Sequence, residues 1–138
     1  MKPGASGQAL LDAVKMGNNQ KAALLLTEGV YTEVRDEKGD TPFLYAVKTG
    51  NVQIVRMMLK QDIDREARSG NGKGPLELAL DSGSEEMFHC LLDGGISPDE
   101  MGHDNNPLLL KAVQFREMGT IRLLLDNGVA PSATGKDG

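Results

Sequence analysis

The chain has 138 residues, enough for one domain with a substantial buried core, but aromatic residues make up only 4% of it and tryptophan is absent. Aromatic side chains carry much of the buried area in a thick core, so this composition favours a thin fold built from leucine, alanine, methionine and valine. The net charge of −5 argues against a nucleic-acid partner, and because no stretch is long and apolar enough for a membrane span or a secretory signal, we expect no membrane contact.

The same residue types recur at a spacing of 33 residues along the whole chain. The clearest registers are Ala13, Ala46, Ala79 and Ala112; Leu26, Leu59, Leu92 and Leu125; and Gly17, Gly50 and Gly83, with Arg116 in the fourth place. Registers in phase without an insertion predict four units, 3–35, 36–68, 69–101 and 102–134. One such unit cannot bury its own apolar side chains, so the units are expected to stack.

The first two units are each predicted to hold two short helices. The first unit has Asn18 at the N-cap of its second helix. In the second unit, Thr41 is expected to cap the first helix and Pro42 to occupy its first position, where a missing N–H costs nothing. Gly50 is expected to end that helix and Asn51 to cap the next one.

The third and fourth units follow the same plan with three departures. Gly74 replaces the capping threonine of the third unit, which predicts a lost cap, while Ser84 keeps the cap of its second helix. In the fourth unit, Pro107 stands at the threonine position. Arg116 stands at a glycine position, where a left-handed backbone would cost about 1–2 kcal/mol.

The stretch GDTPFLYAVKTGNVQIVRMMLKQDID, residues 39–64, resembles the ankyrin repeat family pattern G-x-T-P-L-H-x-A-A-x-x-G-x-x-x-I-V-x-L-L-L-x-x-G-A-D. The resemblance implies an all-α solenoid of helix–turn–helix units with short outward hairpin loops. The family's capping histidine is replaced by Leu11, Leu44, Glu77 and Leu110, so its hydrogen bonds between turns are expected to be absent. Residues 1–138 are expected to form one domain. Residues 135–138 fall in register with the turn of a partial fifth unit, which suggests a chain cut from a longer protein or one that ends in a frayed partial repeat.

The motifs that resemble chemical sites are weak. The glycine-rich stretch 69–75 does not fit G-x-x-x-x-G-K-[ST] and follows no predicted strand. His89, Cys90 and His103 are too few for a zinc site, and neighbouring helical residues such as His89 and Cys90 do not face each other. We expect no catalytic residue, no metal and no cofactor, with Cys90 a small buried hydrophobe. A lone cysteine indicates a reducing, intracellular setting, the cytoplasm or the nucleus.

A row of carboxylates also recurs at one-unit spacing. Paired acids can cleave glycosides, but that chemistry needs a sugar cleft and one acid with a raised pKa. An exposed row of hairpins is expected to offer neither, so we interpret the row as solvated and paired with nearby arginines. The acids are Glu33, Glu66 and Asp99, and the arginines are Arg35, Arg65 and Arg68.

Two groups of positions vary between units while the core registers hold: the two columns before the inter-helix glycine, and the hairpin tips. The resemblance places both on a concave groove, where structure does not dictate them and they are free to carry specificity. The candidate partner-binding residues are Lys15, Met16, Glu37, Lys38, Asp40, Lys48, Thr49, Asn71, Lys73, Asp81, Ser82, His103, Asp104, Asn106, Gln114 and Phe115.

The sequence therefore predicts a protein–protein interaction module, monomeric and not an enzyme, whose rigid groove binds a protein partner. Phe115 is expected to anchor the partner, with mixed charges around it setting orientation. Two alternatives stay open. One is a self-contained regulatory inhibitor of an enzyme such as a kinase. The other is a structural spacer within a longer array.

Overall fold

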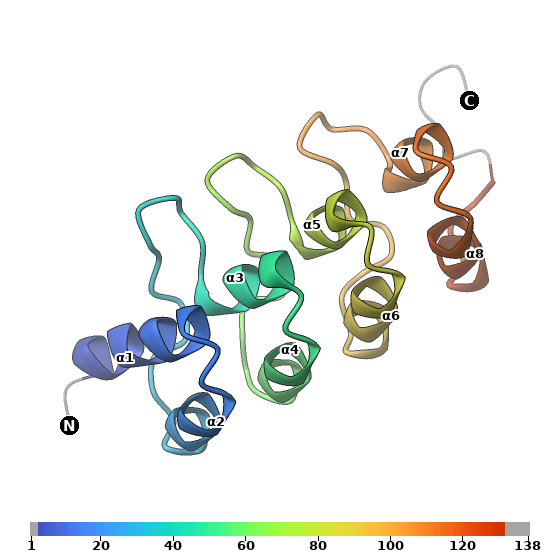
Figure 1. Ribbon diagram of the computed structural model, residues 1–138. Helices are drawn as coiled ribbons and strands as arrows, with labels where there is room; N and C mark the ends of the chain where they lie inside the picture. Colours follow the sequence, from blue (N-terminus) through green and yellow to red (C-terminus); the bar gives the residue numbers. More distant parts are fainter. Residues whose placement is uncertain (1–2, 132–138) are drawn as a thin grey trace.

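The computed structural model describes residues 3–131, and in that part the chain forms eight α-helices in four successive helix–turn–helix pairs (Figure 1). The pairs are α1 (Pro3–Lys15) with α2 (Asn19–Thr27), α3 (Pro42–Thr49) with α4 (Val52–Leu59), α5 (Pro75–Ser82) with α6 (Glu85–Asp93), and α7 (Leu108–Gln114) with α8 (Met118–Asp126). The all-α class is thus confirmed. The predicted start of a fifth unit at 135–138 lies outside the described residues.

The pairs stack side by side as a two-layered row (Figure 1). Helices α1, α3, α5 and α7 form the inner layer, and α2, α4, α6 and α8 form the outer one. The loops that join successive pairs project to one side as hairpins, and each closes with the same backbone bond, such as Asp36 N–H to the Asp40 carbonyl at 2.9 Å. The predicted stack with outward hairpins is therefore present.

The predicted helix ends are confirmed. The Thr41 hydroxyl accepts from the Leu44 N–H at 3.2 Å, and Asn51 accepts from Ile54 N–H at the same distance. Gly50 ends α3 in the left-handed region, with φ of 78°. Arg116 takes the same kind of backbone, with φ of 57°, so the expected strain is present in the fourth unit.

The alanine register forms the centre of the core, whereas the leucine register is buried at Leu26 and Leu59 but 40% exposed at Leu125. The four alanines of the repeat, at most 2% exposed, lie where the helices pack closely. The column after them is buried at Val14, Val47 and Leu80 but 46% exposed at Val113, which no later described unit covers.

The column that contains Cys90 is more mixed than a core register. Cys90 itself is buried with a free thiol, whose pKa burial raises, but Leu24 in the same column is 65% exposed. Helix α2 buries Ala22 and Leu26. Leu24 lies two residues from each of them and therefore points to the opposite side of the helix. Leu24 therefore lies outside the core, although it shares the column of Cys90.

As predicted, Gly74 gives α5 no side-chain cap, but a side chain from the loop after α6 takes over this role. The Glu100 carboxylate accepts from Leu76 N–H at 3.1 Å and from Glu77 N–H at 2.9 Å. Gly74 makes this possible, since a Cβ there would lie 2.6 Å from the Glu100 carboxyl carbon. Burial raises the pKa of Glu100, and the two backbone hydrogen bonds only partly oppose that rise.

The arginines of the hairpins pair with backbone rather than with the acidic row. Arg35 donates to the carbonyls of Gly39 and Arg68, and Arg68 donates to those of Gly72 and Met101, at 2.6–3.0 Å. None of the ion pairs in the described part of the chain joins these arginines to the row of acids. The expected pairing is wrong, because each guanidinium fork fits the free carbonyls of two successive loops.

Candidate protein-binding face

The structure brings the inner-helix ends and the hairpins together on one side, which we call the inner face. Ion pairs join the two groups directly: Lys48 on α3 reaches Asp40 on its hairpin at 2.7 Å, and Lys15 at the end of α1 reaches Asp36 at 3.3 Å. Around Phe115, both groups line one small cavity of about 130 Å³. The two sets of predicted partner-binding residues therefore share one surface.

One column of the inner face carries no charge along the whole array. It consists of Met16, Thr49, Ser82 and Phe115, and we call it the uncharged column. Met16 is 81% exposed and Phe115 54%. The hydroxyls between them donate back into their own helices, Thr49 to the Tyr45 carbonyl at 3.0 Å and Ser82 to that of Ala79 at 2.9 Å. Apolar side chains thus lie at both ends of a neutral column.

The neighbouring column is charged, but its charges are neutralised within the protein. Lys15 and Lys48 pair with hairpin acids, as described above. In the third unit the signs are reversed, because Asp81 on α5 pairs with Lys73 on its hairpin and with Lys111 of α7. The two lysines lower the pKa of Asp81 against the effect of its partial burial.

Asp40 does not lie at an exposed hairpin tip, so that expectation is wrong. Its side chain is 1% exposed, with one carboxylate oxygen on Lys48 and the other buried without a hydrogen-bond partner among the described residues. The backbone explains its position: Asp40 closes the turn with Asp36 and directly precedes the cap of α3. Asp40 therefore holds Lys48 in place from beneath the surface.

Most of the other predicted hairpin residues are exposed to solvent. Glu37, Lys38, Asn71, His103 and Asp104 are exposed, while Lys73 and Asn106 are half-buried. Asp104 accepts from Asn106 N–H at 3.1 Å, and this hydrogen bond lowers the pKa of its carboxyl.

Glu77 is a residue that sequence reasoning misjudged. Fully buried on α5, its carboxylate accepts from the backbone N–H of His103 at 2.7 Å, from the His103 ring at 2.6 Å and from Lys111 at 2.9 Å. Burial acts to raise the pKa of Glu77, but the hydrogen bonds from Lys111 and His103 hold it below its usual value. The expected absence of hydrogen bonds between turns is therefore wrong between the third and fourth units.

The Glu77 cluster fixes the surroundings of Phe115. Lys111, held by Glu77 and Asp81, places its ammonium 5.6 Å from the centre of the Phe115 ring. This is a cation–π distance, which orients the ring from one side. An acid at the otherwise leucine register of Glu77 was the sequence signal for this arrangement.

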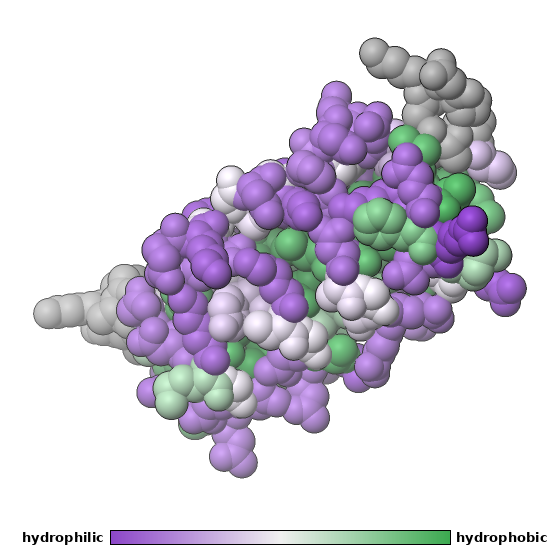
Figure 2. All heavy atoms as spheres, turned by 45° about the horizontal axis from the view of Figure 1, so that its top comes forward, coloured by the Kyte–Doolittle hydropathy of each residue, from purple (hydrophilic) through white to green (hydrophobic). Residues whose placement is uncertain are grey.

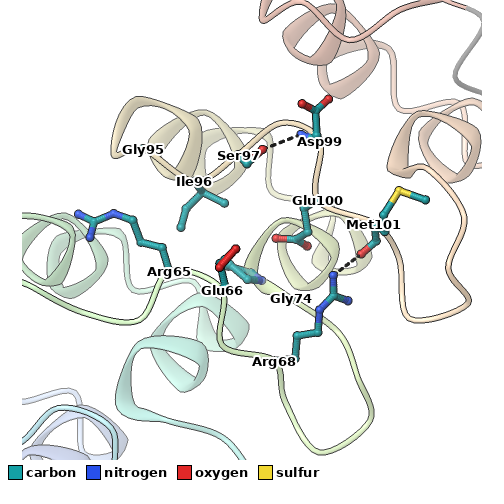
Figure 3. A pocket seen from close by; sticks show the side chains of 11 residues that line it. Arg65, Glu66, Arg68, Gly74, Gly95, Ile96, Ser97, Asp99, Glu100 and Met101 are labelled. Carbon is teal, nitrogen blue, oxygen red and sulfur yellow. Dashed lines mark hydrogen bonds between the residues drawn. The ribbon is translucent and has the colours of Figure 1, made fainter.

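Figure 2 shows this side of the molecule, with hydrophilic hairpins beside a broken band of hydrophobic and nearly neutral surface. A separate hollow of about 570 Å³ lies between the loops 65–75 and 95–101 (Figure 3). Glu66 and Asp99 of the predicted acidic row line it, together with Arg65 and the capping Glu100. Among residues 3–131, no group of three or more histidine, cysteine or acidic side chains is arranged to hold a metal ion.

Stacked helix–turn–helix units with projecting hairpins define a repeat solenoid. The family model for ankyrin repeats (3 copies) matches residues 10–102, more than half of the chain, and the chain belongs to the ankyrin repeat family. Ankyrin repeats are in general protein–protein interaction modules, and the family is typically non-enzymatic. A search of curated proteins found no match. Across the described part of the chain, no helix is both long and apolar enough to span a bilayer.

Proposed function

We propose that this chain is a recognition module whose four units, 3–35, 36–68, 69–101 and 102–134, form one domain and bind a protein partner on the inner face. The observation that carries the proposal is Phe115: a large apolar side chain, 54% exposed, that an internally paired lysine orients. An exposed aromatic side chain held in one orientation loses little entropy on binding and is typical of an interface anchor.

The anchor is held in place by the ion pairs that Lys111 makes with Glu77 and Asp81. Because their ion pairs exist before a partner arrives, the face is preformed and the partner bears most of the ordering cost. The candidate residues on either side, such as Gln114 and His103, would form the polar rim around the anchor.

The proposal is tested by affinity purification with the wild-type chain, the Phe115→Ala variant and a Leu24→Ala control. Leu24 is 65% exposed on the outer helix α2, so the control removes a comparable apolar side chain from another surface. Proteins that bind the inner face should be lost with Phe115→Ala and kept with Leu24→Ala, while both variants keep the wild-type circular dichroism spectrum. With a recombinant partner, we expect Phe115→Ala to weaken binding about tenfold or more. Equal retention by all three proteins would contradict the proposal.

A further inference from the structure

The uncharged column indicates what kind of segment fits the inner face. We infer that the partner presents an amphipathic α-helix, about 16–20 residues long, with an apolar anchor near each end and little net charge on the contacting side. This inference rests on the proposed function and adds the class of partner to it.

The length follows from the repeat geometry. Met16 and Phe115 occupy the same register three units apart. Helix α1 packs on α3, α3 packs on α5, and the third step is made by the packing of α6 on α8. Packed helices lie about 8–10 Å apart, so three steps separate the two side chains by about 24–30 Å. At about 1.5 Å per residue, that distance corresponds to about 16–20 residues of α-helix.

The electrostatics along the uncharged column disfavour a strongly acidic partner helix. Three lysines near the uncharged column are each within 3.3 Å of an internal carboxylate. Lys15 and Lys48 of the neighbouring column pair with Asp36 and Asp40, and Lys111 beside Phe115 pairs with Glu77. A partner carboxylate placed along the uncharged column would have to displace one of these. Apolar contacts at Met16 and Phe115 therefore supply the affinity, and ionic strength has little influence on it.

The hydrogen-bonding groups favour a helix over an extended segment. An extended chain leaves its backbone N–H and C=O groups to be paired by the surface it binds, whereas a helix pairs them internally. On the uncharged column, the hydroxyls of Thr49 and Ser82 already donate to their own helices. The column thus suits a ligand that needs few hydrogen bonds from it.

The test uses two displayed peptide libraries as probes: 20-residue helices randomised on one side of a charge-neutral scaffold, and eight-residue segments held extended by flanking prolines. Selected peptides are then measured as synthetic molecules against the wild-type chain, Phe115→Ala, Met16→Ala and the Leu24→Ala control, at 0.05 and 0.5 M NaCl. Both anchors are exposed, so their variants should keep the wild-type thermal midpoint.

We expect binders from the helix library, with apolar residues about 16–20 positions apart. Each anchor variant should weaken them about tenfold, Leu24→Ala should not, and the salt change should alter their affinity less than about threefold. Inner-face binders that are extended, acidic or strongly salt-dependent would overturn the inference and leave the proposed function standing. Binders insensitive to both anchor variants would contradict the inference and the proposed function together.

Discussion

Because Glu100 caps α5 from the loop after α6, positions 74 and 100 are predicted to be energetically coupled. In α3, Thr41 caps its own helix, whereas in α5 the Glu100 carboxylate does so above Gly74. Valine stands at the Glu100 register in the first unit, at Val34. We predict that Gly74→Thr and Glu100→Val each destabilise the protein, and that the double variant unfolds with nearly the wild-type free energy.

The magnitude follows from the contacts. Loss of an N-cap costs about 0.5–2 kcal/mol, so Glu100→Val should lose about 1 kcal/mol. Gly74→Thr would place its Cβ 2.6 Å from the Glu100 carboxyl carbon, so the carboxylate must leave the helix end, and we expect a similar loss of about 1 kcal/mol. The backbone at Gly74, with φ of −85° and ψ of 179°, is extended and accepts threonine without strain. In the double variant the threonine hydroxyl can cap α5, so the coupling free energy should be about 1–2 kcal/mol.

The assay is urea unfolding followed by circular dichroism at pH 7 for all four proteins of the cycle. Thr41→Ala serves as the calibration, because it removes an ordinary cap from α3 and should cost about 1 kcal/mol. Additive losses, with the double variant least stable, would refute the reasoning that Glu100 and threonine are alternative caps for one helix end.

Two further predictions concern the fourth unit. Glu77→Gln should lower the free energy of unfolding by about 1–3 kcal/mol at pH 7, because Lys111 and His103 lose their buried anionic partner. Since folding lowers the pKa of Glu77, this carboxylate stabilises the folded protein above the ordinary value of 4.5, and the stabilisation is lost as pH falls toward the lowered pKa. Denaturant titrations in which wild type and variant still differ by the same free energy in acid would contradict this. Arg116→Gly should raise the free energy of unfolding by about 0.5–1 kcal/mol, because relief of the strained backbone at φ 57° exceeds the entropy cost of glycine. Arg116→Ala should not raise it, since alanine has the same strain. Equal thermal midpoints for the two variants would count against strain at this position.

The fold was predictable because its determinants are local and repeated. Caps such as Thr41 and Asn51 act on N–H groups three residues away, and the alanine column recurs in phase, so both can be recognised from spacing alone. The roles of Glu77 and Glu100 were not predictable in this way. Each bonds a backbone more than twenty residues distant: Glu100 reaches back to α5 within its own unit, and Glu77 reaches His103 across the junction to the next unit.

On the candidate face, too, the features set by local position were predictable and those set by distant contacts were not. Column position correctly indicated that Met16 and Phe115 are exposed. It could not show that Asp40 is buried beneath Lys48, because that depends on the path of the hairpin backbone. Nor could it show that nearby lysines are paired internally, which shifts the expected source of affinity from charge to apolar contact.

The most direct test of the account is an NMR titration of the isotope-labelled chain with the tightest peptide from the helix library. We predict that the largest chemical-shift changes fall at Met16, Thr49, Ser82 and Phe115, with little change at Leu24, Arg56 and His89 on the outer helices. The largest changes on the outer helices, with the uncharged column unaffected, would contradict the claim that the inner face is the recognition surface.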